Sequence, residues 1–127
     1  MAFILKPNYG QDIMINRWNW YPTVELMVRE GLLTKERAEV CRFNGCGSYI
    51  TGEEADCVSV RLDSLLKRMR PGEHLLMDGT VTDVRKEHNL PSDESPELDW
   101  DNVFSASFEW LSNFRDFCRT CNGFKIV

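Results

Sequence analysis

The chain has 127 residues, of which 43% are hydrophobic, 11% aromatic and 28% charged, and its formal net charge is −5. This length suits one domain and the aromatic content exceeds that of disordered chains, so we expect a single globular domain over residues 1–127. No apolar run reaches the roughly 20 residues of a membrane span and the N-terminus lacks a secretory signal, so we expect a cytoplasmic protein without membrane association.

The negative charge is concentrated in one segment near the C-terminal third. Residues 91–101 contain five acids and no Lys or Arg, whereas the rest of the chain balances fifteen acids with fifteen bases. The five acids are Asp93, Glu94, Glu97, Asp99 and Asp101. Together with the prolines and serines between them, they predict a solvated acidic loop at about 88–101. The basic residues form no stripe that would follow a phosphate backbone, so nucleic acid is not an expected partner.

The N-terminal third is predicted to contain short strands and then two helices. Residues 3–5 and the alternating apolar segment 13–15 each fit a short strand. A helix is expected at 22–30, because its proline suits a first turn and a glycine follows its last residue. A second helix is expected at 34–42, where a threonine caps the N-terminus, and residues 44–48 are rich in turn formers.

The clearest local signal is the capping box formed by Thr51 and Glu54, which predicts the start of a helix. Apolar residues then recur every three or four positions, so we expect a helix over 52–70. Residues 73–90 fit two interpretations. Asp78 and Gly79 suit a hairpin turn, whereas Thr80 suits the start of a helix, which we favour slightly.

The last long segment, about 102–121, is predicted to be the central core helix, with Asp101 as its cap. Its apolar residues cover about half of the helix circumference, and the turn formers at 122–123 end it. Residues 124–127 fit a final strand that could pair with the N-terminal segment. We therefore predict a mainly α fold, a compact single-domain helical bundle with short peripheral β segments from the termini, with an α+β arrangement as the alternative.

The cysteines suggest two readings. Cys118 and Cys121 have the spacing of half a zinc site or of a redox pair, and Cys41 with Cys46 could complete a zinc site. The Cys118–Cys121 pair falls near the end of an apolar helix face, however, where free thiols usually pack as small hydrophobes. We therefore favour packing and keep zinc as the alternative. No structural disulfide is expected in a reducing compartment.

Function is less well determined than fold. The leading hypothesis is a protein-interaction module, an adaptor or inhibitor-like binder of a basic partner, because the five acidic residues of 91–101 could attract such a partner. A patch formed by Trp18, Trp20 and Tyr21 could supply interface anchors, although we favour the interpretation that these aromatics cover the core. The zinc-stabilised protein is the second hypothesis.

The third hypothesis is an enzyme with an unrecognised site, in which His74 or His88 would meet a cysteine or a carboxylate. The sequence contains no phosphate-binding loop, serine elbow or metalloprotease motif. It therefore predicts no catalytic residue and no cofactor other than the zinc alternative, and it leaves the oligomeric state open.

Overall fold

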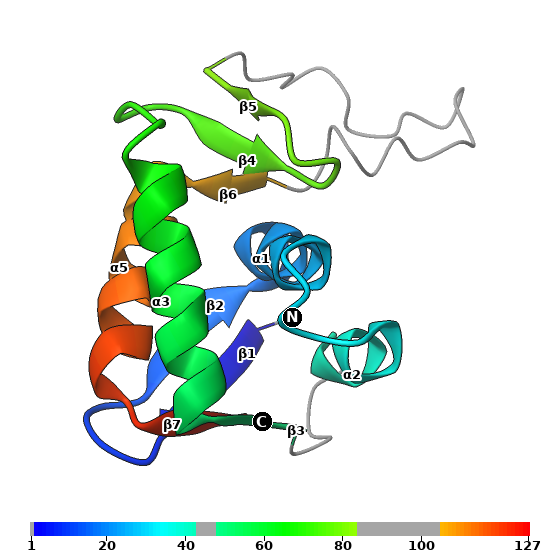
Figure 1. Ribbon diagram of the computed structural model, residues 1–127, viewed down its shortest axis with the longest axis vertical. Helices are drawn as coiled ribbons and strands as arrows, with labels where there is room; N and C mark the ends of the chain where they lie inside the picture. The colour runs from blue at the N-terminus through cyan, green and yellow to red at the C-terminus, as the bar shows by residue number, and fades with distance from the viewer. Residues whose placement is uncertain (1, 43–47, 84–104) are drawn as a thin grey trace.

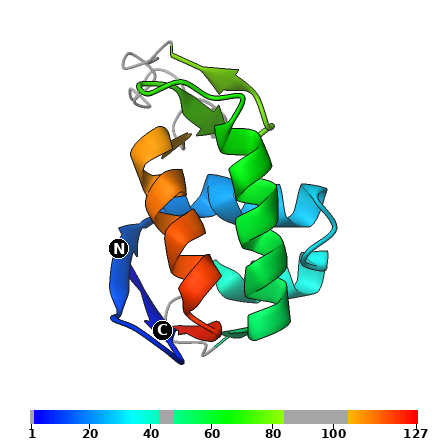
Figure 2. The ribbon, with the colours of Figure 1, turned by 60° about the vertical axis from the view of Figure 1, so that its left-hand side comes forward.

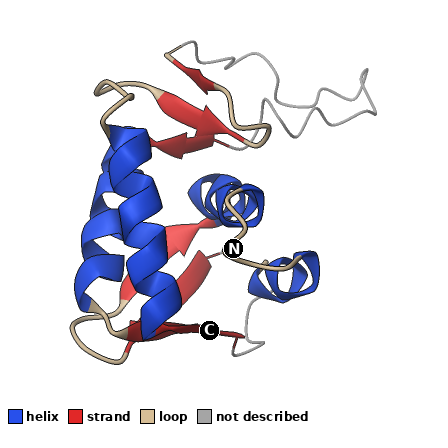
Figure 3. Cartoon of the chain, in the orientation of Figure 1, coloured by secondary structure: helices blue, strands red, loops and turns tan. Residues whose placement is uncertain are grey.

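The computed structural model describes residues 2–42, 48–83 and 105–127, and Figure 1 shows how their elements are arranged. In chain order they are β1 (Ala2–Pro7), β2 (Ile13–Asn16), α1 (Arg17–Arg29), α2 (Lys35–Cys41), β3 (Ser48–Thr51), α3 (Gly52–Leu66), β4 (His74–Leu76), β5 (Val81–Thr82), β6 (Ser105–Ser107), α5 (Phe108–Thr120) and β7 (Gly123–Ile126). The described residues form two antiparallel sheets of four and three strands as well as helices. The predicted mainly α bundle is therefore wrong, and the fold is α+β (Figure 3).

The larger sheet joins the two ends of the chain. Its strand order is β2-β1-β7-β3, and every neighbouring pair is antiparallel. Leu5 of β1 lies opposite Ile126 of β7, which confirms the predicted pairing of the last segment with the N-terminal one. Among the described strands, β2 and β3 form the two edges of this sheet.

Side chains alternate across the larger sheet, so that one face is buried and the other is solvated. The buried face carries Phe3, Leu5, Ile15, Ile50, Phe124 and Ile126. The helices cover this face, as Figures 1 and 2 show. The opposite face carries more exposed residues, among them Met14, Lys6, Lys125 and Tyr49. This period of two is what a sheet with one covered face requires.

The smaller sheet, of order β5-β4-β6, corrects two predictions. The hairpin reading of residues 74–82 is right, because the Leu76 amide donates to the Thr80 carbonyl at 2.8 Å and Gly79 adopts φ +93° in the turn. The helix favoured from Thr80 is wrong for Val81–Thr82, and residues 84–90 lie outside the described ranges. Residues 105–107, predicted as helix, pair instead with β4.

The paired helices α3 and α5 form one side of the molecule. They run antiparallel and side by side, with α5 starting near the smaller sheet and ending near the larger one (Figure 2). The helix predicted over 52–70 is confirmed to Leu66, with both hydrogen bonds of the capping box present. The last helix begins at Phe108 rather than near residue 102, and its cap is Ser107 instead of Asp101. The helix does not begin at residue 102 as predicted, because the backbone groups of residues 105–107 form hydrogen bonds with β4 in the smaller sheet.

Helix α1 begins earlier than predicted. The Asn16 side chain caps it by accepting from the Asn19 amide at 3.0 Å, and Pro22 lies buried within the helix rather than in its first turn. The sequence argument placed the start at Pro22, because a proline in the first turn removes no intrahelical hydrogen bond. In the structure the Asn16 cap sets the start instead, and Pro22 lies inside the helix, where it supplies no backbone donor. Helix α2 is confirmed, with Thr34 as its cap.

Candidate interaction surface

The aromatic patch predicted around residue 20 divides between core and surface. Trp20 is fully buried, and its indole N–H donates to the Cys41 carbonyl at 2.8 Å. Tyr21 is half-buried, and its hydroxyl donates to the Arg42 carbonyl at 3.4 Å. Trp18 is 37% exposed, and the Arg17 guanidinium lies over its ring, 5.4 Å from the ring centroid. Trp20 and Tyr21 therefore tie α1 to the end of α2 rather than serve as exposed anchors.

Several predicted site residues lie outside the residues that the structure describes. They are Asp93, Glu94, Glu97, Asp99, Asp101, Cys46 and His88. The acidic segment, the complete four-cysteine set and the second histidine therefore stay predictions. His74 is described and lies in β4, opposite Thr82 and Ser107.

The described cysteines of the zinc hypothesis are all buried. Burial raises the pKa of Cys41, Cys118 and Cys121, which disfavours the thiolate that binds metals. The Cys121 thiol donates to the Cys118 carbonyl at 3.7 Å, within the same helix end. Across the described ranges, no group of three or more His, Cys, Asp or Glu residues is arranged to hold a metal ion. The zinc hypothesis stays a prediction, because Cys46 lies outside these ranges.

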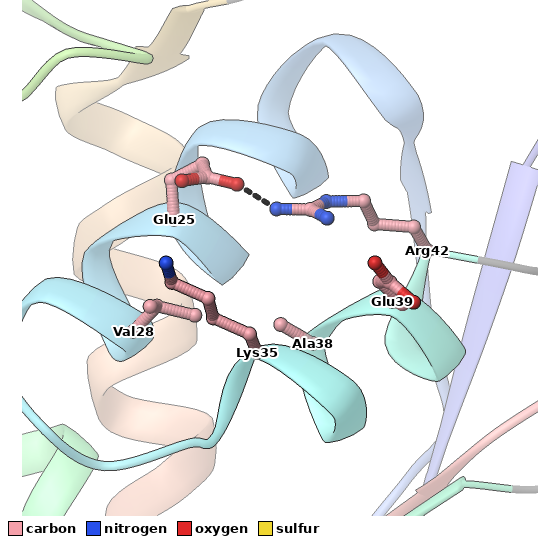
Figure 4. Close-up of a pocket in the computed structure, with 6 residues that line it drawn as sticks. All are labelled: Glu25, Val28, Lys35, Ala38, Glu39 and Arg42. Atoms are coloured by element: carbon pink, nitrogen blue, oxygen red, sulfur yellow. Dashed lines mark ion pairs between the residues drawn. The ribbon is translucent and has the colours of Figure 1, made fainter.

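A small hollow of about 220 Å³ lies between α1 and α2 (Figure 4). Its walls are Glu25, Val28, Lys35, Ala38, Glu39 and Arg42. Two acids and two bases alternate around it, and an ion pair joins Glu25 to Arg42. The charges of its walls are balanced, so the hollow favours neither an anionic nor a cationic ligand. His74, which the enzyme hypothesis needs, is not among its walls.

A larger groove of about 610 Å³ lies between α5 and the edge strand β2. Its walls are Ile13, Met14, Trp110, Asn113, Asp116, Phe117 and Thr120. The aromatic walls belong to a ladder on α5, in which Trp110 and Phe117 each stack on the buried ring of Phe114, with centroids 5.1 and 6.2 Å apart. The groove therefore has an apolar floor supported from below by the core.

Trp110 is fixed in place by a polar network as well as by stacking. Its indole N–H donates to the Thr23 hydroxyl at 2.9 Å, and that hydroxyl donates to the Asn19 carbonyl at 2.8 Å. The Asn19 side chain in turn accepts from the Ser107 amide at 2.9 Å, just before α5. These bonds join the N-terminal ends of α1 and α5, so this end of the groove is preorganised.

The charge of the groove is negative. Asp116 is the one charged residue among the described walls. Its carboxylate is 3.1 Å from Arg115 Nε, but another nitrogen of that guanidinium reaches across to Asp63 of α3 at 3.3 Å. Arg115 thus divides its charge between two carboxylates, and the side of Asp116 that faces the groove can attract a cation.

Three large apolar side chains in and beside the strand that borders this groove are exposed. Tyr9, Met14 and Trp18 are 77%, 70% and 37% exposed, and all three fall within ten residues of sequence around β2. The Tyr9 amide donates to the Cys121 carbonyl at 2.9 Å, so its loop lies at the C-terminal end of α5. Of these three residues, Met14 also lines the groove, so an exposed apolar side chain belongs to the site itself.

Sequence reasoning missed the residues that line this groove. It assigned Trp110 and Phe117 to the core face of the last helix and gave no role to Met14 or Asp116. Two signals could have pointed to the site: the alternating segment 13–15, typical of a short strand, and the seven-residue spacing of the two aromatics, which puts them on one helix line. Their meeting depends on tertiary contact, which spacing alone does not predict.

Comparison with known proteins adds no family or function. No protein-family model matches the chain, and neither the curated proteins nor the solved structures include a significant match. Within the described ranges, no helix has the length and apolar character needed to cross a bilayer.

Proposed function

We propose that this chain is a protein-interaction module that binds a basic protein partner through the groove between α5 and β2. The observation that carries the proposal is the combination of an apolar floor, exposed Met14 on an edge strand and the carboxylate of Asp116, the one charged group among the walls that the structure describes. An apolar centre with a charged rim is the usual composition of a specific protein interface.

The sign of the charge favours a basic partner over an acidic or neutral one. Asp116 lies on the groove wall, and the chain as a whole carries a formal charge of −5. Opposite charge on the partner would speed association and orient it, and the effect would weaken as salt is added. We place this interaction in the cytoplasm, where the buried thiols of Cys41, Cys118 and Cys121 would remain reduced.

The proposal is tested by comparing which proteins are retained by wild-type chain and by matched variants. Asp116→Lys reverses the wall charge, whereas Val60→Ser changes an equally exposed residue on α3, away from the groove. We expect Val60→Ser to retain the partners of the wild type and Asp116→Lys to lose them. Circular dichroism should show that all three chains fold alike.

A third variant separates the groove from the acidic segment. It replaces the five acids of 91–101 with their amides and leaves the groove intact. Loss of binding in this variant alone would assign recognition of the basic partner to the segment. Equal retention by wild type and Asp116→Lys would overturn the proposed function of the groove.

A further inference from the structure

At Met14, the backbone N–H and C=O of β2 point away from the rest of the sheet. Ile4 and Val127 exchange both backbone hydrogen bonds, at 3.2 and 2.9 Å, so the N–H and C=O of Ile4 point toward β7. In an antiparallel sheet these groups alternate in direction from one residue to the next, so those of Leu5 point toward β2. Leu5 lies opposite Ile13, and the backbone of Ile13 therefore points back at β1. The backbone N–H and C=O of the next residue, Met14, must therefore point away from β1, toward the outer edge of the sheet.

The residues that flank Met14 show where an added strand would place its side chains. Ile13 and Ile15 project to the helix side of the sheet, where Ile15 is buried and Ile13 lines the groove. Opposite residues of neighbouring strands project to the same side. A segment paired with Met14 would therefore direct the residues before and after its central one toward Trp110 and Asp116.

We propose that the basic partner binds as an extended segment that adds an outer strand beside β2. Its central residue would exchange backbone hydrogen bonds with Met14, and its two flanking side chains, one apolar and one basic, would contact the aromatic floor and Asp116. This inference rests on the proposed function and specifies its mode of binding. Strand addition to an open sheet edge is a recurring way of recognising peptides, with the backbone giving affinity and alternate side chains giving specificity.

A helical partner fits this site less well. A helix satisfies its own backbone donors and acceptors, so it would cover the outward N–H and C=O of Met14 without pairing with them, which is costly. β2 is four residues long, or roughly 13 Å, so an added strand can form only a few backbone bonds. The side chains in the groove must therefore supply much of the selectivity.

The test uses two pools of synthetic peptides of about nine residues, enough to span the edge strand. In one pool a leucine or valine and a lysine or arginine stand two positions apart at the centre, and in the matched pool glutamate replaces the base. We expect the wild-type chain to retain the basic pool and not the acidic one. Equal retention of both pools would overturn the proposed partner chemistry.

Variants at Met14 then test the mode of binding with a peptide that the wild type retains. Met14→Pro removes the outward N–H, which an edge strand tolerates, while Met14→Ala shortens the side chain and keeps the N–H. We expect the proline variant to bind about tenfold more weakly than the alanine variant. If Met14→Pro does not fold, the wild type is tested with a peptide methylated at each backbone nitrogen in turn, and at least one position should reduce binding to the same extent.

The outcomes separate the mode of binding from the proposed function. Equal binding by Met14→Pro and Met14→Ala, together with loss in Asp116→Lys, would overturn strand addition and leave the groove as the binding site. Equal binding by wild type and Asp116→Lys would count against both proposals. A wild-type dimer that Met14→Pro dissociates would show that a second copy occupies the edge, and it would overturn the assignment to a basic partner.

Discussion

Replacing Glu54 with glutamine should reveal how much one ion pair contributes to the stability of this fold. Two nitrogens of the Arg37 guanidinium reach the two carboxylate oxygens of Glu54, and the contact between Nη2 and Oε1 spans 2.9 Å. Arg37 also donates to the Tyr49 carbonyl at 2.9 Å, so the pair joins α2, β3 and α3. The Glu54 side chain accepts from the Thr51 amide as well, and glutamine can keep that bond.

The magnitude follows from the pKa of the carboxyl group. The hydrogen bonds from Arg37, opposed by partial burial and aided by Thr51, lower the pKa of Glu54 from 4.5 to about 2. In full, such a difference would correspond to about 3.4 kcal/mol. The two side chains are 25% and 39% exposed, however, and solvent screens an exposed pair, so we expect about 1–2 kcal/mol.

The pH dependence of this effect has a definite sign. The folded state holds the Glu54 carboxylate ionised below its ordinary pKa, so the stabilisation is complete above about pH 4.5 and is lost as the pH falls toward 2. Urea unfolding of wild type and Glu54→Gln should therefore differ by about 1–2 kcal/mol at pH 7 and by much less near pH 2.5. An equal difference at both pH values would refute the ion pair as its cause.

Two further pairs of variants test the packing of the fold. Gly123→Ala would place a Cβ 2.9 Å from the Ile50 carbonyl at φ +97°, whereas Gly10→Ala meets the strain of φ +109° with no atom of the described residues within 4 Å. Thermal unfolding should show a loss of about 1 kcal/mol for Gly10→Ala and at least twice that for Gly123→Ala; equal losses would show that the close contact relaxes. Cys57 is exposed and Cys118 is buried, so a thiol reagent should label Cys57 in the folded chain and reach Cys118 only on unfolding. Cys118→Ser should cost about 1–3 kcal/mol and Cys57→Ser almost nothing, and equal costs would contradict the burial of Cys118.

Local signals predicted several elements correctly because they act within one or two turns. The Thr51–Glu54 capping box, the Thr34 cap and the left-handed turn at Asn122 and Gly123 each satisfy backbone groups close in sequence. Such arguments need no knowledge of the rest of the chain. The pairing of the last segment with the first was also predicted, because both are short apolar runs at the ends of the chain.

Other predictions that depended on distant contacts failed. The strand at 105–107 falls within the amphipathic segment predicted as helix over 102–121, and only its pairing with β4 shows that it is not helical. The sequence left Trp20 open between core and interface, and the contact of its indole nitrogen with the Cys41 carbonyl, twenty-one residues away, is what places it in the core. The groove escaped notice for the same reason, since α5 meets β2 through the order of strands in the sheet and not through any local motif.

Amide hydrogen exchange along β2 tests the central claim, an open edge that binds a partner, most directly. In the free chain we predict that the Met14 amide exchanges rapidly while those of Ile13 and Ile15, which point at β1, exchange slowly. Saturation with a basic peptide that the chain retains should slow the Met14 amide about tenfold or more. A Met14 amide that is already protected in the free chain, or whose exchange is unchanged in the complex, would contradict the account.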